Sequence, residues 1–349
     1  MATDVIDWNL ALSTGSRLAP RGPEMELDQA RATVRQLRSL ADDAVAPVRE
    51  CTGLVAPTSA PPAAVIDRKV WIESNIDAFR FVLHPVLDRV RSSDPSPAVT
   101  EVGSRVTALQ MGAVLAWLSG RVLGQYEALV PPGQSPRLML IAPNIVNVAQ
   151  IIGADERDFA MWVCLHEETH RVQFTAVPWL SDYFSAETRT LVAAVDVPAS
   201  ELLSKSGQLL GALMQVLRGK DGAQALLLSV LTPTQREVFD RISALMTLLE
   251  GHADVVMDEV GPDVVPSVAS IRASFNSRRA QPGTTDSIIR KVLGMDAKMR
   301  QYSEGAAFVR AVVDQVGMAG FNEVWANSTN LPTLPEIAEP SLWVKRVHG

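Results

Sequence analysis

Two histidines spaced four residues apart carry the first chemical signal in this chain: His166 and His170, in the segment His166-Glu167-Glu168-Thr169-His170. On a helix this spacing places both imidazoles on one face, one turn apart, where both can bind a single zinc ion. Glu167 then lies beside the metal position that the protein ligands leave open. From there its carboxylate can take a proton from an attacking water, so we expect Glu167 to be the general base.

The segment in front of these histidines predicts the helix that they need. Asp155 is a suitable N-cap, and Glu156 and Asp158 place negative charge in the first turn, where the helix dipole favours it. Apolar residues dominate up to Leu165, and no proline or glycine interrupts the run before Pro178. The two histidines are therefore expected on a long helix flanked by core residues.

A catalytic zinc site usually has three protein ligands, and the sequence after His170 does not supply the third. Neither the glycine nor the third histidine of the pattern HExxHxxGxxH follows, since Ala176 lies where that histidine is expected. We therefore expect a carboxylate ligand, Glu250, from elsewhere in the chain. Glu250 lies in a second strong helix pattern, which begins with a Thr232-Pro233 cap and has a broad apolar face.

Two neighbours of Glu250 bear on the same site. Asp254 is one helical turn further on and shares a face with Glu250, so we expect it to accept a hydrogen bond from the far nitrogen of a zinc-bound histidine. His252 competes with Glu250 for the third-ligand position. Two residues along a helix correspond to a rotation of about 200°, so both side chains cannot face one metal unless the helix breaks, and Gly251 is where such a break could occur.

The HExxH segment followed much later by Glu-x-x-x-Asp on another helix resembles the gluzincin branch of the zincin metallopeptidases. More closely, the chain resembles an actinobacterial family of zincin-like hydrolases of unassigned function, some of whose members are associated with biosynthesis of the deazaflavin coenzyme. The matching segments extend over nearly the whole chain: Asp7-Trp8, Leu18-Ala19-Pro20, Trp71-Ile72, Asn75, Gly124-Gln125-Tyr126-Glu127, Ala142-Pro143-Asn144-Ile145, His166 to Phe174, Glu250 to Asp254, Leu331-Pro332-Thr333 and Trp343. The resemblance implies a zinc-dependent, peptidase-like fold without a known substrate.

Helical patterns dominate the rest of the chain, so we expect a mainly α (α+β) protein. It would have a zincin-like fold with a long active-site helix, a small β-sheet and a helical bundle. Residues 1–60 are expected to form an N-terminal arm that packs on a catalytic domain of residues 61–349, or the two form one continuous domain. An apolar helix is predicted over 99–129. Leu138-Met139-Leu140-Ile141 is the best strand, and we expect it to be an edge strand that pairs with an extended substrate.

The expected chemistry is zinc-dependent hydrolysis of a peptide or amide bond, with Zn²⁺ as the cofactor. Tyr302 is the expected oxyanion-stabilising group, with Tyr126 and His252 as competitors. Two other classes of function stay open. One is a catalytically inactive zincin fold that serves in binding or assembly, and the other is an amidase that acts on a non-peptide metabolite.

Composition narrows the partners and the location. The formal charge of −7 and the pI near 5.4 argue against nucleic acid as a partner. Cys51 and Cys164 do not make a disulfide framework, and Cys164 is expected to be a buried apolar residue rather than a ligand. The acidic start of the chain lacks the basic and apolar regions of a secretory signal, and no stretch is apolar enough to span a membrane. We therefore expect a cytoplasmic protein with a peptide or small amide substrate, in an oligomeric state that the sequence does not indicate.

Overall fold

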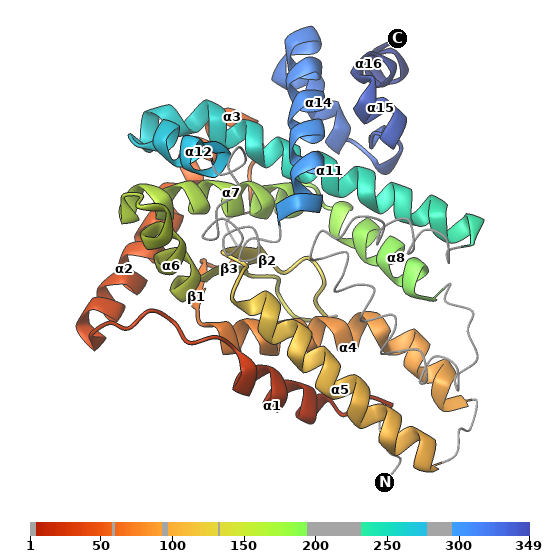
Figure 1. Ribbon diagram of the computed structural model, residues 1–349. Coiled ribbons are helices and arrows are strands. Elements are labelled where there is room, and N and C mark those ends of the chain that lie inside the picture. The colour runs from red at the N-terminus through yellow and green to blue at the C-terminus, as the bar shows by residue number, and fades with distance from the viewer. Residues whose placement is uncertain (1–4, 58–59, 93–96, 132, 194–231, 278–294) are drawn as a thin grey trace.

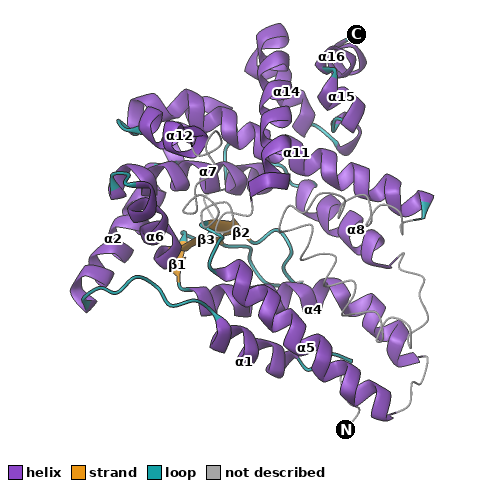
Figure 2. Ribbon diagram, in the orientation of Figure 1, coloured by secondary structure: helices purple, strands orange, loops and turns teal. Residues whose placement is uncertain are grey.

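The computed structural model describes residues 5–57, 60–92, 97–131, 133–193, 232–277 and 295–349. Within these ranges the chain is mainly helical with one small sheet, as expected from its sequence (Figures 1 and 2). The α-helices are α1 (Trp8–Leu18), α2 (Leu27–Asp43), α3 (Val45–Thr52), α4 (Arg68–Ser92), α5 (Pro97–Ser119), α6 (Ala142–Ile152), α7 (Glu156–Ala176), α8 (Leu180–Ala193), α11 (Pro233–Val264), α12 (Val268–Ser277), α14 (Met295–Phe321), α15 (Leu334–Ala338) and α16 (Pro340–His348). Two short 3₁₀ helices, Asn322–Trp325 and Ser328–Asn330, connect α14 to α15.

The sheet consists of β1 (Ala64–Ile66), β2 (Gly124–Tyr126) and β3 (Leu138–Ile141) in the order β1-β3-β2. β3 pairs in parallel with β1 and antiparallel with β2, and all its residues are buried. The strand predicted over Leu138–Ile141 is confirmed, but its expected edge position is wrong, because both of its sides are paired. Four consecutive apolar residues indicate burial on both faces, which is typical of a central strand. Of the described strands, β2 is the edge nearest to α7.

The helix predicted over 99–129 is too long at its C-terminal end. α5 ends at Ser119, and Gly124 lies in strand β2 instead. Two glycines of this region have separate roles. Gly112 lets α1 approach closely, since a Cβ atom there would come within 2.6 Å of the carbonyl oxygen of Ala11, whereas Gly124 is needed at the site described below.

The two helices that carry the metal motif have the predicted caps. The side chain of Asp155 accepts hydrogen bonds from two backbone N–H groups in the first turn of α7. Thr232 forms a capping box with Gln235 at the start of α11. Inside α11, Gly251 does not break the helix but lies against Gly305 of α14, so two glycines allow the helix backbones to cross in close contact. Glu250 and His252 therefore project from opposite sides of a continuous helix.

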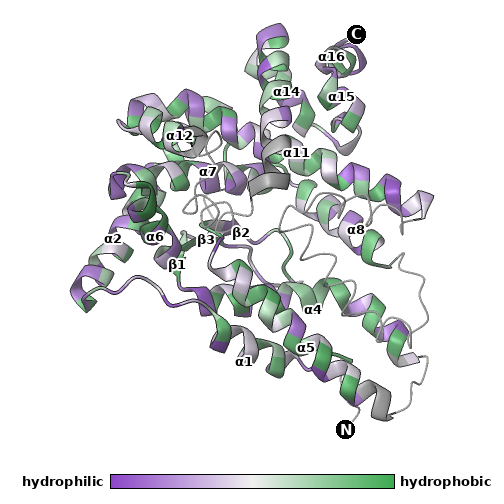
Figure 3. Cartoon of the chain, in the orientation of Figure 1, coloured by the Kyte–Doolittle hydropathy of each residue, from purple (hydrophilic) through white to green (hydrophobic). Residues whose placement is uncertain are grey.

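Three clusters of buried apolar residues surround these elements. One joins α2, α3 and α6 to α7 and the C-terminal half of α11, and a second joins α11 to α14, α15 and α16. The third lies between α1, α4, α5 and β3. Figure 3 shows hydrophobic and hydrophilic residues intermixed along most of these helices, as amphipathic packing requires. A boundary at residue 60 stays a prediction. No helix in the described part of the chain is long and apolar enough to cross a membrane.

Candidate metal centre

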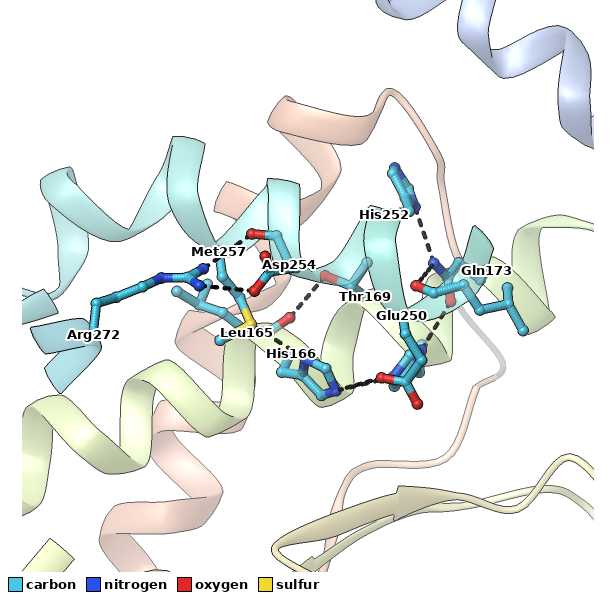
Figure 4. A network of polar contacts seen from close by, with 11 residues as sticks. Leu165, His166, Thr169, Gln173, Glu250, His252, Asp254, Met257 and Arg272 are labelled. Carbon is cyan, nitrogen blue, oxygen red and sulfur yellow. Dashed lines mark hydrogen bonds and ion pairs between the residues drawn. The ribbon is translucent and has the colours of Figure 1, made fainter. Parts of the chain in front are cut away.

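His166, His170 and Glu250 converge between α7 and α11, as the sequence predicted. One ligand atom from each lies within 4.8 Å of the other two. The Nε2 atoms of the two histidines are 3.1 Å apart, and Oε2 of Glu250 lies 3.5 and 3.6 Å from them. Figure 4 shows the imidazole of His166 and the carboxylate of Glu250 projecting from their helices toward one another.

These distances fit a tetrahedral zinc ion. With ligand atoms about 2.0–2.1 Å from the metal, the edges of a zinc tetrahedron are roughly 3.3–3.4 Å long. The charge also fits. Burial lowers the pKa of His170, but the hydrogen bond and the negative charge of Glu250 outweigh burial and, with Glu167, raise it to about 9. A proton on His170 thus balances the negative charge of Glu250 and Glu167, which a bound divalent cation would also balance.

The far nitrogens of the two imidazoles have different partners from the one predicted. Nδ1 of His170 lies 2.9 Å from Oε1 of Gln173, and Nδ1 of His166 lies 3.2 Å from the sulfur of Met257. The structure places Asp254 instead in an ion pair with Arg272, at 2.8 Å (Figure 4). One turn along a helix advances a side chain by about 6 Å, and this carries Asp254 past the metal ligands to α12. Gln173, on α7 itself, makes the contact with the far nitrogen of a histidine that we predicted for Asp254.

His252 lies on the far side of α11 and is fully buried. Its Nδ1 accepts a hydrogen bond of 3.0 Å from the side-chain amide of Gln173, and its ring packs against Phe321 and Trp325. Burial, with a smaller contribution from the charge of His170, lowers its pKa to about 3, so the ring is neutral at pH 7. The structure does not bring His252 to the other two histidines as a third ligand. Instead, His252 contacts Gln173, and Gln173 in turn contacts His170.

Glu167 is buried on the side of α7 that faces strand β2. A Cβ atom at Gly124 would lie only 2.6 Å from Oε1 of Glu167, so a residue with a side chain does not fit there without a shift. The edge strand therefore passes directly beside the predicted general base. The sequence placed Gly124 within the helix predicted over 99–129, because a three-residue strand has no periodicity to detect.

Residues whose chemistry the sequence did not reveal hold β2 in this place. Gln125 points away from the side of the strand occupied by Gly124 and accepts a 2.7 Å hydrogen bond from the indole nitrogen of Trp71. Glu127, just after the strand, forms an ion pair with Arg137. Asn144 donates to the backbone oxygens of Ser119 and Val122, which precede β2. Most of the family-like segments around the sheet thus fix the strand that contacts Glu167.

The remaining predicted residues have varied outcomes. Tyr302 lies within α14, but its side chain is outside the described residues, so its proposed role stays a prediction. Tyr126 lies at the end of β2 and stacks on Phe174 of α7, with ring centroids 5.5 Å apart. Cys164 is buried, and burial raises the pKa of its thiol; it belongs to the core around α7, as predicted.

Comparison with known proteins shows the family of this chain. The family model of zincin-like metallopeptidases matches residues 6–344. The chain belongs to this family. A crystal structure from Chloroflexus aurantiacus, described as that of a presumed hydrolase with a novel fold, is similar to it, with 31% sequence identity and a TM-score of 0.69 over 98% of this chain and 99% of that one. No curated protein matches the chain.

Membership of the zincin-like metallopeptidase family implies a metal, typically zinc, and hydrolase chemistry. His166, His170 and Glu250 are the group of possible metal ligands found in the described part of the chain. The donors found in the structure, two imidazoles and a carboxylate, are of the kind that zinc binds. An actinobacterial origin and a link to deazaflavin coenzyme biosynthesis stay predictions from the resemblance.

Proposed function

We propose that this protein is a zinc-dependent hydrolase that cleaves peptide or amide bonds, with Glu167 as the general base. The observation that carries the proposal is the convergence of His166, His170 and Glu250 beside a buried Glu167. Bound zinc would lower the pKa of a water molecule and polarise the scissile carbonyl group. Every other part of the chemistry depends on residues of the chain.

Neighbouring groups and helix packing hold the proposed ligands in place. Oε1 of Gln173 can only accept, so the facing Nδ1 of His170 carries a proton, and Nε2, which faces Glu250, is the nitrogen that would bind the metal once its own proton leaves. The pair of histidines comes from one turn of α7, and Glu250 comes from a different helix that is held by close packing against α14. A site of this kind is built on rigid elements, and this limits the movement of its ligands.

Glu167 would take a proton from the attacking water and transfer it to the leaving nitrogen, which is the role of a general base that then acts as a general acid. Its position against Gly124 restricts the carboxylate on one side. Because no Cβ atom intervenes, the backbone of the edge strand approaches the base closely. The substrate backbone can then lie next to both the strand β2 and the carboxylate of Glu167.

Strand β2 favours a peptide over a compact metabolite as the substrate. Leu123 and Glu127 exchange backbone hydrogen bonds with the β3 side of the sheet, so in this antiparallel register the N–H and C=O groups of Gly124 point to the open edge. An extended peptide can pair with such an edge by adding a strand. The edge role that we predicted for Leu138–Ile141 therefore passes to Gly124–Tyr126.

The test is cleavage of a mixed-sequence peptide library by zinc-loaded protein, followed by mass spectrometry. We expect cleavage by the wild type, its loss on addition of a chelator, and its recovery when zinc is restored. Glu167→Gln should lower the rate by about 10² to 10⁴ while zinc stays bound, because only the proton transfer is removed. Full turnover by Glu167→Gln would contradict the mechanism, and no cleavage by the zinc-loaded wild type would contradict the peptidase assignment.

A further inference from the structure

A pocket of about 330 Å³ lies beside the C-terminal half of α7. Its walls come from four parts of the chain: the segment before β1, the end of β2, the start of β3 with the residues before it, and the beginning of α8. Tyr126, Phe174, Arg171, Pro61, Pro136 and Ser181 are among the lining residues. The volume is within the range of small-ligand sites, which is about 300–1,000 Å³.

The pocket continues directly from the proposed catalytic centre. Tyr126 is two residues after Gly124, so the two lie on the same side of β2, and Gly124 contacts Glu167. Phe174 is one helical turn after His170, about 6 Å further along α7. Since Tyr126 stacks on Phe174 at 5.5 Å, β2 and α7 run alongside each other from the general base to the pocket. A peptide that pairs with β2 would therefore pass the pocket within one or two residues of the scissile bond.

The pocket wall contains one cationic side chain, and its charge is already paired. Nε of Arg171 lies 2.7 Å from one carboxylate oxygen of Glu168, and Nη2 lies 2.8 Å from the other. Nη1 of the same guanidinium group donates to the backbone oxygen of Pro61. The side chain is largely buried, at 12% exposure, so this pair is shielded from competing ions. A charged side chain of a substrate would have no free counter-ion in this pocket, and it would lose part of its solvation.

The rest of the lining is apolar or neutral. The rings of Tyr126 and Phe174 form one wall, and Pro57, Pro61, Pro136 and Pro178 contribute rigid, uncharged surface. Burial raises the pKa of Tyr126 to about 12, so its hydroxyl group keeps its proton at pH 7 and can act as a hydrogen-bond donor. Proline walls also cost little conformational entropy when a ligand binds, because their backbone is already restricted.

We propose that this pocket binds a bulky uncharged side chain of the substrate, aromatic or large aliphatic, next to the amide bond that is cleaved. The inference rests on the proposed peptidase function and deepens it, because it names the class of residue that the same site selects. The occupant follows from two features of the structure. The pocket continues the edge of β2, where the substrate backbone would lie, and its one cation is neutralised by Glu168.

The probes are amino-acid hydroxamates, which bind a catalytic zinc ion through their hydroxamate group and differ only in side chain. Binding of the glycine, leucine, phenylalanine, aspartate and lysine hydroxamates to zinc-loaded protein would be measured by isothermal titration calorimetry. We expect the phenylalanine and leucine compounds to bind about tenfold or more tightly than the glycine compound, as expected for burial of a large apolar side chain. The aspartate and lysine compounds should show no such gain.

A variant that fills the pocket shows where this preference arises. Ser181→Trp places a large ring in the pocket wall, and Asp182→Trp places the same ring at the next, exposed position of α8, outside the pocket. Ser181→Trp should reduce phenylalanine hydroxamate to the affinity of the glycine compound and leave the glycine compound unchanged, whereas Asp182→Trp should change neither. Thr175→Trp, at another position of the pocket lining, repeats the test if Ser181→Trp fails to fold.

The outcomes separate this inference from the proposed function. Equal binding of all five hydroxamates to zinc-loaded protein would overturn the pocket assignment while the metal centre stands. A preference for phenylalanine that survives Ser181→Trp and Thr175→Trp would also overturn it. If no hydroxamate binds zinc-loaded protein, the proposed function fails and the pocket assignment fails with it.

Discussion

Oε1 of Gln173 lies 2.9 Å from Nδ1 of His170, and the amide group of the same side chain donates to Nδ1 of His252 and to the backbone oxygen of Leu249. Gln173 is fully buried. A single side chain on α7 thus connects one predicted zinc ligand to the segment of α11 that carries another. This contact orients the imidazole of His170 and keeps the two helices in register across the metal position.

Replacing Gln173 by leucine should weaken zinc binding by about 10- to 100-fold, as expected when the outer partner of a ligating histidine is lost. Leucine is of similar size but offers no acceptor to His170. Zinc affinity would be measured by competition with a chromogenic chelator. Gln315→Leu, an exposed change on α14, is the control and should bind zinc like the wild type. Equal affinities of the two variants would show that Gln173 does not position His170.

Gly124→Ala should destabilise the fold and reduce activity, because the added Cβ atom overlaps the carboxylate of Glu167. The decisive measurement is a double-mutant cycle by urea unfolding of the metal-free protein. Gly124→Ala should cost about 1–3 kcal/mol in the wild type, a typical cost of overpacking, and much less in a Glu167→Ala background, where the overlap is removed. Equal costs in both backgrounds would mean that the strand does not contact the base as described.

Glu127 should stabilise the end of β2 in a pH-dependent way. Burial raises the pKa of its carboxyl group, but hydrogen bonds and charge from Arg137, with a hydrogen bond from Ser74, outweigh burial and hold the pKa below its usual value of 4.5. A carboxyl group whose pKa is depressed in the folded state stabilises the fold above the unfolded-state pKa, and this contribution is lost as the pH falls through the folded-state value. The stabilisation should therefore be complete above pH 4.5.

Urea unfolding of Glu127→Gln and wild type at a series of pH values measures this contribution. At pH 7 the variant should be less stable by about 1–3 kcal/mol, and the difference should shrink as the pH falls below 4.5. Glu101→Gln removes an exposed ion pair with Arg105 and should change stability by less than about 1 kcal/mol at any pH. A Glu127→Gln effect that is the same at pH 7 and in acid would indicate lost packing rather than a paired charge.

The sequence predicted the parts of this site that depend on spacing along a helix. His166, Glu167 and His170 lie within five residues, so one helix fixes their relation. Glu250 could be found because an acidic residue in a mostly apolar helix suggests a functional role. Two residues along a helix point in nearly opposite directions, so Glu250 and His252 could not both be ligands of one metal ion. The metal ligands are therefore local features, with a single long-range step between α7 and α11.

The sequence did not predict contacts that depend on how the elements pack. Gln173 is only three residues after His170, and that spacing was the one available signal for its role, but its partner in α11 is set by the helix crossing. The role of Asp254 depends on where α12 places Arg272. β2 has only three residues, and one of them is glycine, which has a low strand propensity. Its place beside Glu167 therefore depends on long-range contacts such as that between Trp71 and Gln125.

The most direct test of the central claim is the zinc content of purified protein in a matched pair of variants. Glu250→Gln and Asp254→Asn each replace one acid by its amide, one turn apart on the same helix, and metal content would be measured by atomic emission after dialysis. We expect about one zinc per chain in the wild type and in Asp254→Asn, and little in Glu250→Gln, because two histidines alone leave the site incomplete. Equal zinc in Glu250→Gln and the wild type, or loss of zinc in Asp254→Asn alone, would contradict the ligand set proposed for this protein.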